Sequence, residues 1–554
     1  MPQFRFRMQK QGLGGSNPHT TASMEGLLQG RISTMEKILA ITHQPGMSIG
    51  VLHKGQDVLE HNFGVLDVKT CQKPDGDSLY CIASLSKAFM SASLDMLVQE
   101  GKISWDSTIH SILPDFHHAE KPHVFADMTV RDICTHRTGL LSLDEITQGL
   151  DGRILLPKKD VVKICNALPI KYGLRADFLY NNALYELAGC IVERVSGYSN
   201  WGDFQHDRIF QPLGMTRTTA SRSVHETDNN IATPYVALTD GTPSRIAPTE
   251  LSGDSMNGGS GGVRSSVNDL LKWCRCLLRS FQEEEEEEEE EDGKAGNLVR
   301  HGSPVLNRST IANPRSAEDG DYCAGWCYHR TPARLGLISP NRTLESPMLG
   351  ADSPSLLVYG HQGDVPGYTC NLYIVPESTS ALVILSNGTG WSDATDWIAQ
   401  DVIQTMHGLR PTVDFVEVAS RAAPEYLSHY ANDFKTPLEK DREEITDPPP
   451  LQDFLGSYVM ENLDSVCLDV ELDPEDPAKL WMMVNKQADQ VWELSRHKPD
   501  VFSQLPDSHD KCLSRGLDRT QWSSFLIAFT RGAEGAVEGL RWKLDGVNVH
   551  FPRA

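Results

Sequence analysis

The chain of 554 residues has no run of about 18 apolar residues, the length that crosses a bilayer as a helix. Its N-terminus is polar and lacks the apolar core of a secretory signal, so we expect a cytoplasmic protein; an amphipathic transit peptide is the alternative. Basic residues are the minority, with 51 Lys and Arg against 75 Asp and Glu, a net charge of −24. Bulk charge therefore disfavours binding to nucleic acid or to an anionic membrane.

Cysteine and metal-ligand patterns are sparse. The 12 cysteines follow no framework spacing, which in a chain without a secretory signal favours free thiols in a reducing compartment. Cys323, Cys327 and His329 resemble half of a zinc site, but no second Cys/His pair lies at zinc spacing. We therefore expect no metal and no cofactor. The oligomeric state does not follow from the sequence.

The composition is that of a globular chain, with 39% hydrophobic and 23% charged residues. Residues 1–23 are predicted to be a disordered leader, and residues 24–410 form the large domain, with mixed helical and strand patterns. Residues 411–450 are rich in charge and end in three prolines, which predicts a linker. Residues 451–554 are predicted to form an antiparallel barrel or sandwich. Its strand-like runs are 466–470, 480–484, 525–529 and 547–551.

Ten consecutive acidic residues, Glu283 to Asp292, follow a helical pattern in the large domain. Like charges at this density repel one another and stay solvated. We therefore predict a disordered acidic insertion over residues 283–320; an interaction tail is the alternative.

A candidate nucleophile lies at the start of a predicted helix. Residues 82–87 read Ile-Ala-Ser-Leu-Ser-Lys, and a helical pattern follows as far as Gly101. Ser84 and Lys87 share a helix face, so the hydroxyl and the amine can meet. A lysine desolvated in an apolar pocket loses its proton near neutral pH and can act as a base toward the serine. Alone, the pattern is typical of an N-cap serine and a solvated lysine.

A second polar pair lies where an extended segment turns into a helix. Tyr180 and Asn182 are two residues apart and point the same way on an extended backbone. A tyrosine beside a lysine ammonium has a lowered pKa and can carry a proton. An asparagine amide donates to a substrate carbonyl and accepts from an amide. A core tyrosine and an N-cap asparagine are the alternative interpretation.

The third candidate segment is 359–368, which precedes two strand-like runs at 369–375 and 381–386. Gly363 would allow a substrate to lie close to a strand backbone. Backbone N–H groups there, together with that of Ser84, could hold an oxyanion. His361 taken alone is an ordinary core or surface residue.

In this order, the three segments resemble the serine β-lactamase and penicillin-binding-protein superfamily, whose signature is Ser-x-x-Lys, a second polar motif and a Lys-Thr-Gly strand. Tyr-x-Asn at 180–182 is similar to the class C branch. His-x-Gly at 361–363 resembles the β-lactamase-related esterases, transesterases and D-aminopeptidases of that branch. Segments 128–140, 209–215 and 260–269 resemble other parts of it. The resemblance covers about residues 24–410; residues 451–554 are similar in size and strand spacing to the lipocalin-like barrel of some relatives.

The resemblance implies an α/β (α+β) fold. An antiparallel sheet, flanked by helices, would form from the hairpin 47–52 and 58–64 and the strands after His361. An all-helical region, about 89–345, would be inserted, and the active site would lie between the two. A separate small antiparallel β-barrel would stand at the C-terminus.

The resemblance also implies three catalytic roles. Ser84 would attack a carbonyl and become acylated. Lys87 would take or relay its proton. Tyr180 would assist as a general base and then give a proton to the leaving group.

The remaining site residues are implied to hold the substrate. Asn182 would orient it, and His361 would stand where the family lysine approaches a substrate carboxylate. The backbone N–H groups of Ser84 and Asp364, beside Gly363, would stabilise the oxyanion.

The departures from the signature bear on the substrate. A histidine with its reference pKa of about 6.5 is mostly neutral at pH 7, so the fixed positive charge of the family lysine is lost. This favours ester, small-amide or transacylation chemistry over antibiotic hydrolysis. We therefore expect a serine hydrolase or acyltransferase that acts on a small-molecule ester or amide, as in fungal natural-product pathways. One alternative is a true β-lactamase or D-amino-acid peptidase. The other is a non-catalytic protein that acts through its barrel.

Overall fold

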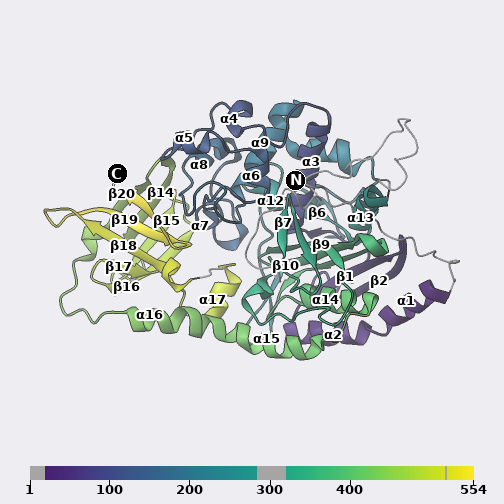
Figure 1. The fold of residues 1–554 in the computed structure, drawn as a ribbon. Coiled ribbons are helices and arrows are strands. Elements are labelled where there is room, and N and C mark those ends of the chain that lie inside the picture. Colours follow the sequence, from purple (N-terminus) through teal and green to yellow (C-terminus); the bar gives the residue numbers. More distant parts are fainter. Residues whose placement is uncertain (1–18, 283–319, 518–520) are drawn as a thin grey trace.

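The larger part of the protein is built on a seven-stranded antiparallel sheet in the order β2-β1-β11-β10-β9-β8-β7. The structure is a computed structural model that describes residues 19–282, 320–517 and 521–554 (Figure 1). The N-terminal hairpin and the strands around and after His361 share this sheet, as predicted. The strands are β1 Gly46–His53, β2 Gln56–Gly64, β7 Asp321–Cys323, β8 Trp326–Arg330, β9 Leu357–Val365, β10 Tyr368–Val375 and β11 Ser380–Ser386.

The central strands are buried on both faces because helices cover both. Every residue of β1, β10 and β11 is buried. Alternate residues of β11 enter different cores: Leu382 and Ile384 pack on one side, and Val383 packs on the other. Helices α2, α14 and α15 cover the first side, and α13 with the helical region covers the second (Figure 1). Their bounds are α2 Ile32–Thr42, α13 Val267–Gln282, α14 Ala394–His407 and α15 Phe415–His429.

The helical region runs from α3 to α13, and its predicted extent, about 89–345, needs correction. Strands β7 and β8, which end at Arg330, belong to the main sheet. Six of the eight residues of these two strands are buried, so their sequence lacks the two-residue alternation that signals a strand. Short strands also interrupt the helices: β4 Tyr235–Ala237, β5 Pro243–Arg245 and β6 Arg264–Ser265. The main helices are α3 Ser86–Gln99, α6 Val130–Cys134, α7 Asp144–Thr147, α8 Val161–Asn166, α9 Ala183–Ser196, α10 Trp201–Gln205 and α12 Gly258–Gly261.

The segment predicted as a linker, 411–450, is helical over most of its length. Helix α15 continues through a π-helical turn, 430–435, into α16 Thr436–Asp441. Phe415, Val418 and Ala419 are buried against α2 and α14, because the charged residues of this segment lie on one face of an amphipathic helix. Residues 411–414 and the stretch 442–450, which ends in Pro448–Pro450, lack regular structure, and the second of these agrees with the effect of prolines on helices.

The C-terminal part is an eight-stranded antiparallel sheet in which each strand pairs with the next, from β13 to β20. A bridge between Tyr458 and Arg553 brings the first and last strands together, so the sheet nearly closes into a barrel. All four predicted strand-like runs lie wholly or mainly in its strands. The bounds are β13 Gly456–Met460, β14 Leu463–Leu472, β15 Leu480–Val484, β16 Val491–Lys498, β17 Val501–Ser503, β18 Leu526–Arg531, β19 Val537–Leu544 and β20 Val547–Pro552.

The barrel packs against the helical region near α7 (Figure 1). The buried Gln490 side chain accepts a hydrogen bond from the Leu150 N–H at 2.8 Å and donates one to the Leu150 carbonyl at 3.3 Å. Arg515 pairs with Asp151 at 2.9 Å, and its carbonyl accepts from the Asp151 N–H at 3.0 Å. These contacts fix the turn that follows α7 to the barrel.

Two further predictions concern the chain outside these cores. Helix α1 His19–Gln29 begins inside the predicted leader 1–23, so at least residues 19–23 are helical; residues 1–18 lie outside the described residues. The predicted acidic insertion 283–320 also lies outside them, except for Gly320. Within the described ranges, no helix combines the length and the apolar character that a bilayer crossing requires.

Candidate active site

Ser84 lies in a tight turn between strand β3 Tyr80–Cys81 and helix α3. The turn is a single 3₁₀ unit, Ala83–Leu85, which packs against β9 and β10 of the main sheet. Ala83 has a φ of 44°, a left-handed conformation that a residue with a side chain rarely adopts. Such a conformation is kept where the surrounding packing enforces it. The turn presents Ser84 half-buried at the boundary between the sheet and the helical region.

Lys87 meets Ser84 as the three-residue spacing predicts, with Nζ 3.0 Å from Oγ. The same nitrogen lies 2.8 Å from Asn182 Oδ1 and 3.0 Å from the Ser260 carbonyl oxygen. Lys87 is fully buried, and this burial lowers its pKa well below the usual value, although the Asp144 carboxylate partly opposes the shift. A neutral amine can donate to Asn182 and Ser260 and still accept the Ser84 proton.

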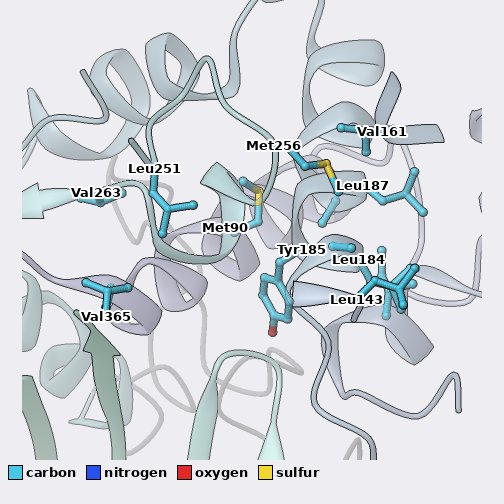
Figure 2. Packing of buried hydrophobic residues seen from close by; sticks show 14 of the residues in the cluster. Met90, Leu143, Val161, Leu184, Tyr185, Leu187, Leu251, Met256, Val263 and Val365 are labelled. Atoms are coloured by element: carbon cyan, nitrogen blue, oxygen red, sulfur yellow. The ribbon is translucent and has the colours of Figure 1, made fainter. Parts of the chain in front are cut away.

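An apolar core behind Lys87 supplies the desolvation. Nζ lies 4.6 Å from the centre of the Tyr180 ring and 5.4 Å from that of Tyr185. Figure 2 shows Tyr185 and Leu184 of α9 in the same cluster as Leu143. The amine therefore faces aromatic rings and three hydrogen-bond acceptors instead of water.

Tyr180 lies beside Ser84, but its predicted lowered pKa is wrong. Burial raises the pKa of this phenol, although the neighbouring Ser84 hydroxyl opposes the shift. Lys87 lies over the face of the Tyr180 ring instead of beside its oxygen, so it does little to stabilise a phenolate. The Tyr180 hydroxyl is buried and forms no hydrogen bond within the described residues. Tyr180 is therefore a neutral phenol, suited to donate a proton.

Asn182 connects Lys87 to a carboxylate that the sequence reasoning missed. Its Nδ2 donates to Asp144 Oδ2 at 2.9 Å, while its Oδ1 accepts from Lys87. Its own backbone N–H donates to Ser142 Oγ at 2.8 Å. The amide expected to orient a substrate thus also links Lys87 to Asp144.

His361 is buried on β9 and makes two hydrogen bonds. Its Nδ1 lies 2.6 Å from the Gln362 carbonyl, which fixes the proton on that nitrogen, and its Nε2 lies 3.0 Å from the Tyr322 hydroxyl, which can donate to it. Burial lowers the pKa of His361 to about 3, and the charge of Lys87 adds to the effect. The expected neutral histidine is confirmed, but its outer nitrogen faces Tyr322.

Gly363 lies directly against the turn that carries Ser84. A Cβ at this position would stand 2.4 Å from both the Ile82 carbonyl oxygen and Cys370 Sγ. The close approach that the glycine permits is therefore made by the protein's own backbone, where the sequence suggested a substrate. Asp364, the next residue, is partly exposed at the end of β9.

Three residues of the site, Ser260, Asp144 and Tyr322, were not among the candidates predicted from sequence. Ser260, whose carbonyl accepts from Lys87, lies in the glycine-rich segment 260–269 already singled out. Asp144 and Tyr322 stand in segments without a motif, and only the folded chain brings them to Lys87 and His361. Within the ranges that the structure describes, no three His, Cys, Asp or Glu side chains are grouped so as to hold a metal ion.

Comparison with known proteins places this geometry in context. The family model described as Beta-lactamase matches residues 32–405. Unguisins hydrolase ungD of Aspergillus violaceofuscus is 23% identical over 394 residues, which cover 68% of this chain and 64% of that protein. Its counterpart in Aspergillus campestris is 26% identical over 267 residues, 47% of this chain and 49% of its own. The chain thus spans less than two thirds of either relative.

A bacterial relative and a solved structure extend the comparison. Penicillin-binding protein 4* of Bacillus subtilis is 23% identical over 367 residues, 64% of this chain and 71% of that protein. The structure of the octameric penicillin-binding protein homologue from Pyrococcus abyssi covers 96% of this chain and 100% of its own, with a TM-score of 0.53 and 18% identity. This likeness concerns the fold, and it extends over both the sheet domain and the barrel.

Proposed function

Since this chain belongs to the β-lactamase family, we propose that it is a serine hydrolase that forms an acyl-enzyme on Ser84. The proposed substrate is a small ester or amide, and the Aspergillus relatives named as hydrolases favour water as the acceptor. Transfer to another acceptor is the finer alternative within the same chemistry. A natural product of secondary metabolism is the substrate class that the resemblance to fungal tailoring enzymes favours.

The observation that carries the proposal is the set of three acceptors around the buried Lys87 amine. Two of them, Asn182 Oδ1 and the Ser260 carbonyl, can only accept, so a neutral amine spends its two N–H groups on them. Its lone pair is then directed at the Ser84 hydroxyl, 3.0 Å away. This is the geometry of a nucleophile with its base.

The reaction follows from these positions. Lys87 takes the Ser84 proton as Oγ forms a bond to the substrate carbonyl carbon. The bond to the leaving group then breaks, while Tyr180 gives its phenolic proton to that group and regains one from Lys87. Water attacks the acyl-enzyme, with Lys87 again as the base, and releases the acid and free Ser84. The backbone N–H groups of Ser84 and Asp364 are the proposed oxyanion donors.

The test is acylation of Ser84 by short-chain p-nitrophenyl esters. The wild type should release nitrophenol with an initial burst and carry an acyl adduct in its intact mass, and Ser84→Ala should show neither. Alcohol or thioester acceptors added to the same assay separate transfer from hydrolysis.

Two outcomes would favour the alternatives. Hydrolysis of nitrocefin or of D-alanyl esters in preference to simple esters would favour a β-lactamase or D-amino-acid peptidase, the reading that penicillin-binding protein 4* supports by its name. The buried, neutral His361 weighs against it, because it offers no fixed charge to a substrate carboxylate. No burst and no adduct with any acyl donor would favour a non-catalytic protein.

A further inference from the structure

Asp144 stands one side chain away from the proposed base and has no role in the steps above. It begins helix α7, and its carboxylate is surrounded by hydrogen-bond donors. Oδ2 accepts from Asn182 Nδ2 at 2.9 Å, and Oδ1 accepts from Ser142 Oγ at 2.9 Å. Gln148 Nε2 and Asn257 Nδ2 also donate to Oδ1, at 3.2 and 3.3 Å.

These contacts select the ionised carboxylate. Three of the four donors are amide N–H groups, which cannot accept a proton from a neutral acid. Burial raises the pKa of Asp144, but the donors Asn182 and Ser142 and the charge of Lys87 all oppose that shift. A negative charge is thus held close behind Lys87.

The same contacts fix which side of the Asn182 amide group faces Lys87. A carboxylate requires an N–H opposite it, so Nδ2 must face Asp144. The amide oxygen is thereby turned toward Lys87 Nζ, 2.8 Å away. Without the carboxylate, nothing in these contacts prevents the amide from presenting its N–H groups to the lysine, where they would compete for the amine lone pair.

We infer that Asp144 is a positioning residue for the proposed hydrolase: through Asn182 it orients the Lys87 amine toward Ser84. This inference rests on the proposed function and adds to it a residue outside the three motifs. The turn after α7 is held by Gln490 of the barrel, so the barrel supports the position of Asp144.

The charged and titratable groups around Lys87 determine the sign of the effect. Asp144 is the carboxylate that favours the protonated amine. Tyr180 and Tyr185 are neutral phenols with raised pKa values, and His361 is a neutral imidazole. His136, the other imidazole near this group, is also neutral, because burial lowers its pKa well below the usual value. Removal of the Asp144 charge should therefore let Lys87 lose its proton at lower pH.

The experiment measures the rate at which a fluorophosphonate probe phosphonylates Ser84, with loss of fluoride, between pH 5 and 9 in the 554-residue chain. The wild-type rate should rise with pH as Lys87 deprotonates. In Asp144→Asn, we expect the midpoint of this rise to move to lower pH by about one unit, the size expected for loss of a nearby charge in a protein interior. The plateau rate should also fall at least about tenfold, because the amine is no longer held in line with Ser84.

Three variants complete the test. Asp144→Glu keeps the charge and should keep the wild-type midpoint with a reduced plateau. Asp144→Ser is a second neutral substitution that should give the same shift if the Asn variant does not fold. Asp115→Asn removes an exposed carboxylate from the helical region and should change neither quantity. Circular dichroism and thermal melting establish that each variant is folded.

The outcomes separate the two proposals. A wild type that reacts at Ser84, with folded neutral variants whose midpoint is unchanged, would overturn the role of Asp144 and leave the hydrolase intact. A wild type that does not react at Ser84 at any pH would overturn both. A reduced plateau without a shift would assign Asp144 a structural role only.

Discussion

Replacement of Gly363 by alanine tests whether the sheet positions the nucleophile. Gly363 lies on β9, and its Cα faces the turn that carries Ser84. An added Cβ would stand 2.4 Å from the Ile82 carbonyl oxygen and from Cys370 Sγ. Ordinary contact begins near 3.4 Å, so the strand and the turn would have to separate by about 1 Å.

This displacement should affect activity more than stability. The strain of one extra carbon in a packed core is about 1–3 kcal/mol, which a domain of this size tolerates. A displacement of about 1 Å between a nucleophile and its oxyanion donors lowers the rate by about 100-fold. We therefore expect Gly363→Ala to remain folded, with a modestly lower melting temperature, and to react with p-nitrophenyl esters about 100-fold more slowly.

Two further variants locate the cause. Gly363→Ala combined with Cys370→Ala removes the sulfur but leaves the Ile82 carbonyl, so activity should not return. Gly26→Ala on α1, where a Cβ meets no atom within 4 Å, serves as the matched glycine control. A folded Gly363→Ala protein with near-wild-type rates would refute the idea that this contact fixes the position of Ser84.

Other predictions follow from single contacts. Tyr180→Phe should slow alkyl ester and amide hydrolysis by about 100-fold or more but affect p-nitrophenyl esters little, because a good leaving group needs no proton donor; equal losses on both substrates would contradict this role. Gln490→Ala should destabilise the protein by about 1–3 kcal/mol in denaturant titrations, since it leaves the buried Leu150 N–H without its partner and removes one of the two donors to the Leu150 carbonyl. Gln487→Ala, which loses one long bond of 3.4 Å, should not. Burial raises the pKa of Glu186 to about 8, so the folded protein holds a proton that the unfolded chain releases near pH 4, and stability is lost as the pH rises through 8. The melting temperature of Glu186→Gln, relative to wild type, should therefore increase between pH 5 and 9, and a constant difference would exclude the linkage.

Local geometry explains which parts of the site the sequence could predict. Ser84 and Lys87 are three residues apart on one helical turn, so their contact depends only on the backbone. The start of helix α9 at Ala183, directly after Tyr180 and Asn182, likewise follows from the local pattern, although Asn182 itself has helical backbone angles and not extended ones. The order of the three motifs then indicated which segments must meet, and the fold brings Asn182 to Lys87 across 95 residues.

The barrel and the segment before it show which elements can be predicted from the hydrophobic pattern of the sequence and which cannot. Four strand-like runs predicted an antiparallel barrel, because half-buried strands carry an alternating signal. Strands β7 and β8 gave no such signal, since both of their faces are buried. The charged residues of 411–441 indicated a linker, and only the packing of Phe415 and Val418 on α2 and α14 revealed a helix of the core.

The sequence by itself determined the chemical groups of the site, their order and the family they belong to, because these depend on residue identity and on spacing along one chain. The tertiary structure decided their protonation states and their partners. Burial raises the pKa of Tyr180 and lowers that of Lys87, so it favours the neutral form of both side chains. Burial is a property of the whole fold. Asp144 contacts Asn182, and Gly363 contacts Ile82, because segments that are distant in sequence pack together. A local sequence pattern does not show which distant segments will meet.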